Sequence, residues 1–121
     1  MTNKQSTMHP LKEFRDQHLI SAQQLSERLG ESSLRVIDVT THLKVLPSGD
    51  FSGVSGRGDY ETGHIPGAMY LDLQNDLSDN TSAFRFTVPS VAQFGAAMQR
   101  AGISESDMVI LYAANHPMWA C

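Results

Sequence analysis

Residues 60–71 read YETGHIPGAMYL, and this stretch predicts a tight corner that leads into a short strand at 68–71. Pro66 fixes its own φ and Gly67 permits the bend that follows it. His64 stands beside the bend, where its ring can bond a backbone carbonyl and pin the corner. Three further side chains are suited to anchor the corner in a core: Tyr60, Ile65 and Leu71.

Short apolar strands alternate with helices around this corner. Residues 34–39, LRVIDV, are almost wholly apolar, as is typical of a strand buried on both faces, and 108–112, MVILY, predicts a central strand. Apolar side chains recur at helical spacing over 22–29 and 91–101. This alternation predicts an α/β domain with a parallel sheet.

Both predicted helices begin with a capping signal. Ser21 with Gln24, and Ser90 with Gln93, match the capping box, in which two side chains satisfy backbone donors reciprocally. A glycine follows each helix, where it can take a left-handed capping conformation. The apolar pair at 19–20 predicts a short edge strand before the first helix.

Two long segments lack periodicity and are predicted to be irregular. Residues 40–63 contain five of the nine glycines, and residues 72–89 carry DLSD and a proline before the second helix. Loops of this length in a compact domain are usually functional or mobile.

Composition excludes several classes of protein. The chain has 121 residues, 40% hydrophobic and 18% charged, which suits a single folded domain. Its net charge of −4 leaves no excess of Lys and Arg, so we expect neither nucleic acid nor an anionic membrane as a partner. One cysteine and five scattered histidines give no disulfide and no familiar zinc spacing, and we expect no metal or other cofactor. No apolar run approaches the roughly 20 residues of a membrane span and no apolar signal core opens the chain, so we expect a cytoplasmic protein.

The stretch YETGHIPGAMYL resembles the N-terminal signature of the rhodanese sulfurtransferases, an aromatic residue followed by H-I-P-G-A and an apolar residue. The resemblance runs in order over residues 19–120, through LISAQQLSERL, LRVIDV, DLSD, VPSVAQFGAAMQRAGI and DMVILY. The segment with DLSD is similar to the two-domain branch, the thiosulfate and 3-mercaptopyruvate sulfurtransferases, and specifically to their N-terminal domain. This implies an α/β fold with a central, mostly parallel sheet and helices on both sides.

The resemblance also implies a chemistry. A catalytic domain of this family places a cysteine directly after the strand that matches MVILY, and the next loop surrounds its thiolate with backbone N–H groups. The thiolate takes a sulfane sulfur from a small anionic donor, thiosulfate or mercaptopyruvate, and passes it to cyanide or a thiol. The corresponding residue here is Ala113, which has no nucleophile, while Cys121 lies outside that position. We therefore expect no catalytic residue in this chain.

Three residues are candidates to support an active-site cleft. In mercaptopyruvate-type relatives the histidine of H-I-P-G-A has been proposed to face the catalytic loop across a domain interface, so His64 has a relay role as an alternative to pinning the corner. Asp59 is the nearest acidic residue that could orient His64, and a solvated loop position is its alternative. Arg57 could attract an anionic substrate or simply sit in water, which we favour.

These features predict the non-catalytic N-terminal module of a two-domain sulfurtransferase, with an arm over 1–18 and an incomplete rhodanese-like domain over 19–121. Its partner would be a C-terminal catalytic rhodanese domain that this chain lacks, so the parent would be an enzyme and this chain alone would not. Truncation would leave strand 108–112 with an apolar face and an edge uncovered, which favours self-association. The alternative is a stand-alone Cys-less module that binds an anion or a protein at the loop 113–120.

Overall fold

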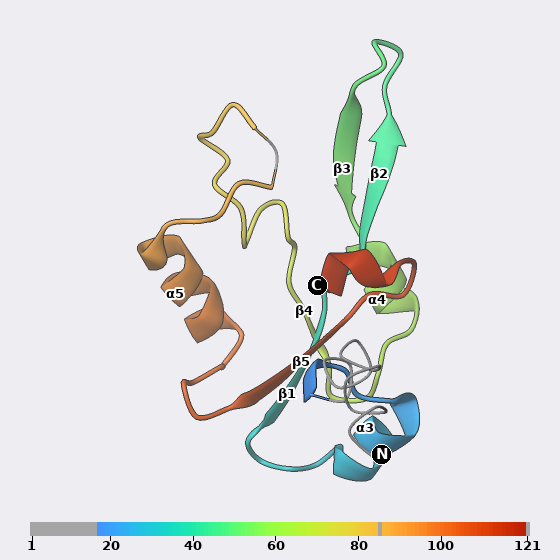
Figure 1. Cartoon of the computed structure of the whole chain (residues 1–121), viewed down its shortest axis with the longest axis vertical. Helices are drawn as coiled ribbons and strands as arrows, with labels where there is room; N and C mark the ends of the chain where they lie inside the picture. The colour runs from blue at the N-terminus through green and yellow to red at the C-terminus, as the bar shows by residue number, and fades with distance from the viewer. Residues whose placement is uncertain (1–16, 85, 121) are drawn as a thin grey trace, which may run out of the picture. The chain divides into compact units, whose positions relative to one another are not determined.

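The structure is a computed structural model that describes residues 17–84 and 86–120 (Figure 1). The chain divides into two compact units, 1–31 and 32–121. Cys121 and most of the predicted arm lie outside the described residues. Within the described residues, no helix is long and apolar enough to cross a membrane.

In the first unit, helix α3 (Ala22–Arg28) begins with the predicted capping box. Gln24 N donates to Ser21 Oγ at 3.1 Å, and Ser21 N donates to Gln24 Oε1 at 3.0 Å. The predicted edge strand at 19–20 is wrong, because these two residues lie outside any strand. Leu19 is 60% exposed, so its side chain has little of the burial that favours a strand.

The second unit contains a three-stranded parallel sheet in the order β4-β1-β5 (Figure 1). Its strands are β1 (Leu34–Asp38), β4 (Met69–Tyr70) and β5 (Met108–Tyr112), which confirms the predicted α/β class and parallel pairing. The prediction that 108–112 is the central strand is wrong, because β1 lies between the other two. An apolar run does not determine the order of strands in a sheet, and this run is not buried either, since Met108 is 50% exposed. Val109 and Leu111 of the same strand are 38% and 43% exposed, and self-association of the chain stays a prediction.

One face of β1 forms the core of this unit. Ile37 and Val39 are fully buried and form a cluster with Leu71 and Ala101. Side chains that pack around this cluster come from helix α5 (Val91–Arg100), from the 72–78 segment and from the short 3-10 helix η1 (Pro117–Ala120). The predicted irregular course of 72–89 is confirmed for its described residues, which form turns.

Helix α5 forms only half of its predicted capping box. Gln93 N donates to Ser90 Oγ at 3.1 Å, but the Gln93 side chain donates to Ser78 O at 2.7 Å. The Gln93 side chain therefore bonds Ser78 and not the backbone N–H of Ser90, and it ties α5 to the preceding turns.

The prediction of an irregular segment over 40–63 is wrong. The chain there forms an antiparallel hairpin, β2 (Thr41–Val45) and β3 (Phe51–Ser55), followed by helix α4 (Arg57–Thr62). The hairpin extends away from the end of the parallel sheet (Figure 1). The glycines of this segment were interpreted as loop residues, but glycine also allows close packing of backbone. A Cβ at Gly56 would lie 2.3 Å from the Thr40 carbonyl oxygen.

Candidate functional site

The carboxyl end of β1 carries a buried polar cluster. The Asp38 side chain is buried, and its Oδ1 accepts hydrogen bonds from Thr40 N at 2.9 Å and from Thr40 Oγ1 at 2.6 Å. Thr41, which is also fully buried, donates from Oγ1 to Val39 O at 3.1 Å. Open α/β sheets bind their ligands beyond the carboxyl ends of the strands, so this end is where a site is expected.

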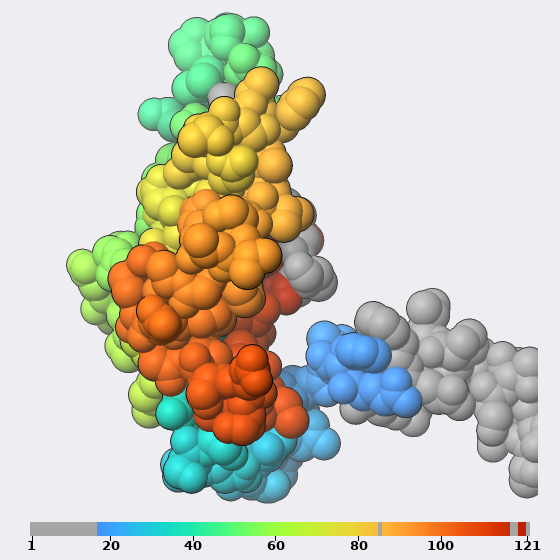
Figure 2. Space-filling view, turned by 90° about the vertical axis from the view of Figure 1, so that its left-hand side faces the viewer, coloured from blue at the N-terminus to red at the C-terminus, as the bar shows by residue number. Residues whose placement is uncertain are grey.

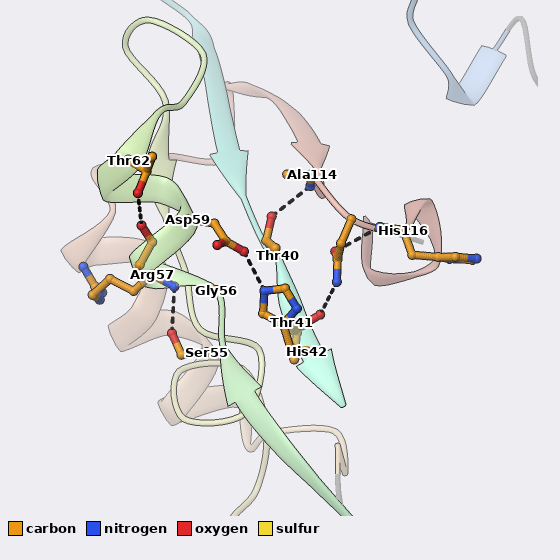
Figure 3. Close-up of polar contacts among 12 residues, drawn as sticks. Thr40, Thr41, His42, Ser55, Gly56, Arg57, Asp59, Thr62, Ala114 and His116 are labelled. Atoms are coloured by element: carbon orange, nitrogen blue, oxygen red, sulfur yellow. Dashed lines mark hydrogen bonds and ion pairs between the residues drawn. The ribbon is translucent and has the colours of Figure 1, made fainter. Parts of the chain in front are cut away.

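The loop after β5 is closed by hydrogen bonds within the chain (Figure 3). Ala113 directly follows the strand. The next amide, Ala114 N, donates to Thr40 Oγ1 at 2.9 Å, and His116 N donates to Asn115 Oδ1 at 2.9 Å. The Asn115 amide group also donates to the carbonyl of Thr41 at 2.7 Å, which ties the loop to the start of β2. Two of the loop's backbone N–H donors, those of Ala114 and His116, are thus already engaged by side chains.

The H-I-P-G-A stretch forms the predicted corner. Ala68 N donates to Ile65 O at 2.9 Å across the bend, and Gly67 has φ +80°, a conformation that favours glycine. Two tyrosine hydroxyls from outside the bend hold it: Tyr60 Oη donates to Ala68 O at 2.5 Å, and Tyr112 Oη accepts from Ile65 N at 3.2 Å. The corner is therefore attached both to α4 and to the last residue of β5.

His64 lies on the outside of the corner. Its ring stacks on Tyr60 with centroids 3.9 Å apart and planes 11° apart. Its Nδ1 lies 2.9 Å from Ile65 O, which is the type of carbonyl contact that the sequence suggested. The side chain is exposed, so both of its contacts stiffen the corner at the surface.

Asp59 does not pair with His64 but with a histidine that the sequence analysis did not select. Its Oδ2 lies 2.5 Å from His42 Nε2, so the pair links α4 to β2 (Figure 3). Asp59 is in a helix and not in the solvated loop considered as its alternative. The two residues are 17 apart in sequence and meet only because the hairpin returns the chain to α4, so no local spacing indicated the pair.

Arg57 is exposed, but water is not its only neighbour. Its guanidinium lies over the Tyr70 ring, 4.9 Å from the centroid, which is within the range of a cation–π contact. Its backbone N donates to Ser55 Oγ at 3.1 Å. The first residue of α4 is therefore held at the base of the hairpin.

The Tyr70 hydroxyl joins the hairpin to the end of β1. It donates to Thr40 O at 2.9 Å, accepts from Gly56 N at 2.8 Å, and lies 3.0 Å from Ser55 Oγ. Burial raises the pKa of the Tyr70 hydroxyl, and it raises the pKa of the Tyr112 hydroxyl likewise. Both groups are thus held as neutral hydrogen-bonding phenols.

The described residues include no group of three or more His, Cys, Asp or Glu side chains that could hold a metal ion. The polar groups near the end of β1 are engaged with one another instead. These hydrogen bonds fix the backbone at the end of β1 and in the loop after β5. At the surface His42 pairs with Asp59, but Ala113 supplies no nucleophile.

The chain is similar to known sulfurtransferases in both sequence and structure. The chain is 35% identical over 97 residues to a probable 3-mercaptopyruvate sulfurtransferase of Pseudomonas aeruginosa and 32% identical over 96 residues to the thiosulfate sulfurtransferase of Rattus norvegicus. Each match covers 78% of this chain, and the matched parts are 32% and 30% of the two relatives. In structure, the chain is similar to Escherichia coli SseA, a 3-mercaptopyruvate sulfotransferase described as having the "Rhodanese" fold. The TM-score is 0.68 at 26% sequence identity, over 80% of this chain and 35% of SseA.

The chain belongs to the rhodanese family. No protein-family model matches it. The rhodanese fold accounts for the parallel sheet and its helices. The chain spans about a third of the length of the sulfurtransferases named above.

Proposed function

We propose that this chain is the non-catalytic N-terminal rhodanese module of a two-domain sulfurtransferase. The observation that carries the proposal is the state of the loop after β5. Ala113 stands where the family resemblance puts the nucleophile, and the amides of Ala114 and His116 are bound to side chains of the chain itself. Such a loop offers neither a thiolate nor these two donors for a persulfide.

The parent protein would move sulfane sulfur from thiosulfate or 3-mercaptopyruvate to a thiophilic acceptor in the cytoplasm, without a metal or other cofactor. The persulfide would form on a cysteine of a companion rhodanese module. The names of the relatives support this donor class, and the share of each relative that is matched leaves room for a second module. This chain would complete the cleft, with His64, Asp59 and Arg57 as its supporting residues and His42 as the partner of Asp59.

The stand-alone binding module is less well supported as an anion site. An anion bound at 113–120 would have to displace Thr40 from Ala114 N or Asn115 from His116 N. Since each exchange would break an existing hydrogen bond, the closed loop disfavours this alternative.

An activity assay tests the proposal. The purified 121-residue chain should give only background turnover with thiosulfate and cyanide, while a longer product of the same gene should be active. Turnover by the short chain that survives purification and disappears in Cys121→Ser would contradict the assignment. A gene that ends after this chain would contradict the two-domain parent.

A further inference from the structure

Asn115 lies in the loop after β5, and both polar atoms of its side-chain amide are engaged. Its Oδ1 accepts a hydrogen bond from the backbone N of His116 at 2.9 Å, and its Nδ2 donates to Thr41 O at 2.7 Å (Figure 3). The side chain is therefore held in one orientation, with its carbonyl group against the backbone nitrogen of the next residue. Asn115 is also exposed, so water and base can reach it.

This contact is the starting geometry for closure of a cyclic imide. A base removes the proton of His116 N, and the nitrogen then attacks Cγ of Asn115. The N–Cγ bond forms, the Cγ–Nδ2 bond breaks, and Nδ2 takes one proton from water and leaves as ammonia. Water then opens the imide at either of its carbonyls, so the product is aspartate or isoaspartate and no oxidant or reductant is consumed. Holding the reacting groups side by side lowers the entropic cost of the ring closure.

The other asparagines that the structure describes lack this geometry. Asn75 and Asn80 are likewise exposed, and Figure 2 shows their segment, in yellow, at the surface. The backbone nitrogen that follows Asn75 donates to Asp72 O at 2.7 Å. The backbone nitrogen that follows Asn80 donates to Asp79 Oδ1 at 2.9 Å. Exposure is thus shared by all three, but among the described residues only Asn115 has the following nitrogen bonded to its own side chain.

We propose that Asn115 is a modification site, at which attack by His116 N converts the side-chain amide to a carboxylate and releases the loop from β2. A carboxylate has no N–H donor. The hydrogen bond to Thr41 O is therefore lost on conversion, and a negative charge faces that carbonyl oxygen instead. The reaction needs only water and base, so the site does not depend on whether the chain belongs to a longer enzyme.

Ageing of the 121-residue chain in a mildly alkaline buffer tests the site. Peptide mapping by mass spectrometry follows the conversion of each asparagine, in the folded chain and in the chain unfolded by guanidinium chloride. We expect Asn115 to convert about fivefold faster in the folded chain than in the unfolded one, because only the fold holds His116 N against the side chain. Asn75 and Asn80 are internal controls and should convert more slowly in the folded chain. A rate at Asn115 that is equal or lower in the folded chain would overturn the proposal.

Two matched variants test the release of the loop. Asn115→Asp supplies the product uniformly, and Asn80→Asp adds the same charge at an exposed asparagine whose amide makes only a 3.4 Å contact, with Asn75 Oδ1. We expect Asn115→Asp to lower the melting temperature by about 4 °C, as the loss of one hydrogen bond would, and Asn80→Asp to leave it unchanged. Equal melting of the two variants would overturn the claim that conversion breaks the contact with β2.

Discussion

The corner at 65–68 and the loop at 113–116 both adjoin the last residue of β5, but they are held by different kinds of group. Hydroxyls of Tyr60 and Tyr112 bond the corner, and both residues are half-buried. Two small polar side chains close the loop, the buried Thr40 and the exposed Asn115. The corner therefore serves as fixed scaffold, whereas in the loop the backbone N–H groups of Ala114 and His116 are bound to side chains of the chain itself.

The largest expected effect concerns the scaffold. Gly56→Ala would force a Cβ to within 2.3 Å of the Thr40 carbonyl, a backbone atom that has little freedom to move. We expect a loss of about 3 kcal/mol in the free energy of unfolding, measured by urea denaturation. Gly58→Ala in the same helix is the matched control, because nothing lies within 4 Å of its Cβ, and it should stabilise the helix slightly. Equal effects of the two substitutions would mean that the close approach at Gly56 is unimportant.

Tyr70→Phe should be the next most damaging change. It removes the acceptor for Gly56 N and the donor for Thr40 O while it keeps the ring beneath Arg57. Gly56 N keeps its second acceptor, Thr40 O at 2.9 Å, so the expected cost is that of the hydroxyl's own hydrogen bonds, about 1–3 kcal/mol, which urea denaturation would detect. Tyr112→Phe, which removes one bond to Ile65 N, should cost less. The reverse order would contradict the central place of the Tyr70 hydroxyl.

Alkaline pH should weaken the same scaffold. Burial raises the pKa values of Tyr70 and Tyr112, and the Asp38 carboxylate contributes to both increases. Because the folded protein holds these protons more tightly than the unfolded chain, their contribution to stability is complete below a pH of about 10 and is lost as the pH rises through the folded-state values. Stability measured against pH should fall in this range, and less steeply in Tyr112→Phe. An unchanged slope in that variant would argue against the burial of the phenol.

His64→Ala should have the smallest effect on stability. The exposed ring contributes a stack on Tyr60 and one contact to Ile65 O, so we expect a loss of about 0.5–1 kcal/mol in chemical denaturation. In the longer gene product, sulfur transfer should fall only in step with folded protein if the histidine pins the corner. A large fall in turnover with unchanged melting would show the cross-domain relay instead.

Sequence predicted the features whose determinants are local. The H-I-P-G-A corner follows from Pro66 and Gly67, and the apolar run at 34–39 indicates β1 without knowledge of its neighbours. The hairpin was missed because the glycines at 53 and 56 resemble loop residues until the segments they approach are known. The sequence did not indicate the pair of His42 with Asp59, because the two residues are 17 apart and meet only through the hairpin. Thr40 and Ala114 are 74 residues apart, so the closure of the loop depends on the register of β1 with β5.

The central claim, that the loop after β5 is not a persulfide cradle, is tested most directly by placing a thiol there. Ala113→Cys in a Cys121→Ser background makes the new cysteine the only one in the chain. The rate of its alkylation by iodoacetamide, measured against pH, reports its pKa. Because Thr40 and Asn115 already engage the nearby amides, the account predicts a pKa close to the ordinary value of about 8.5. A pKa below about 7 would show that the loop still stabilises a thiolate as a catalytic site does, and would contradict the account.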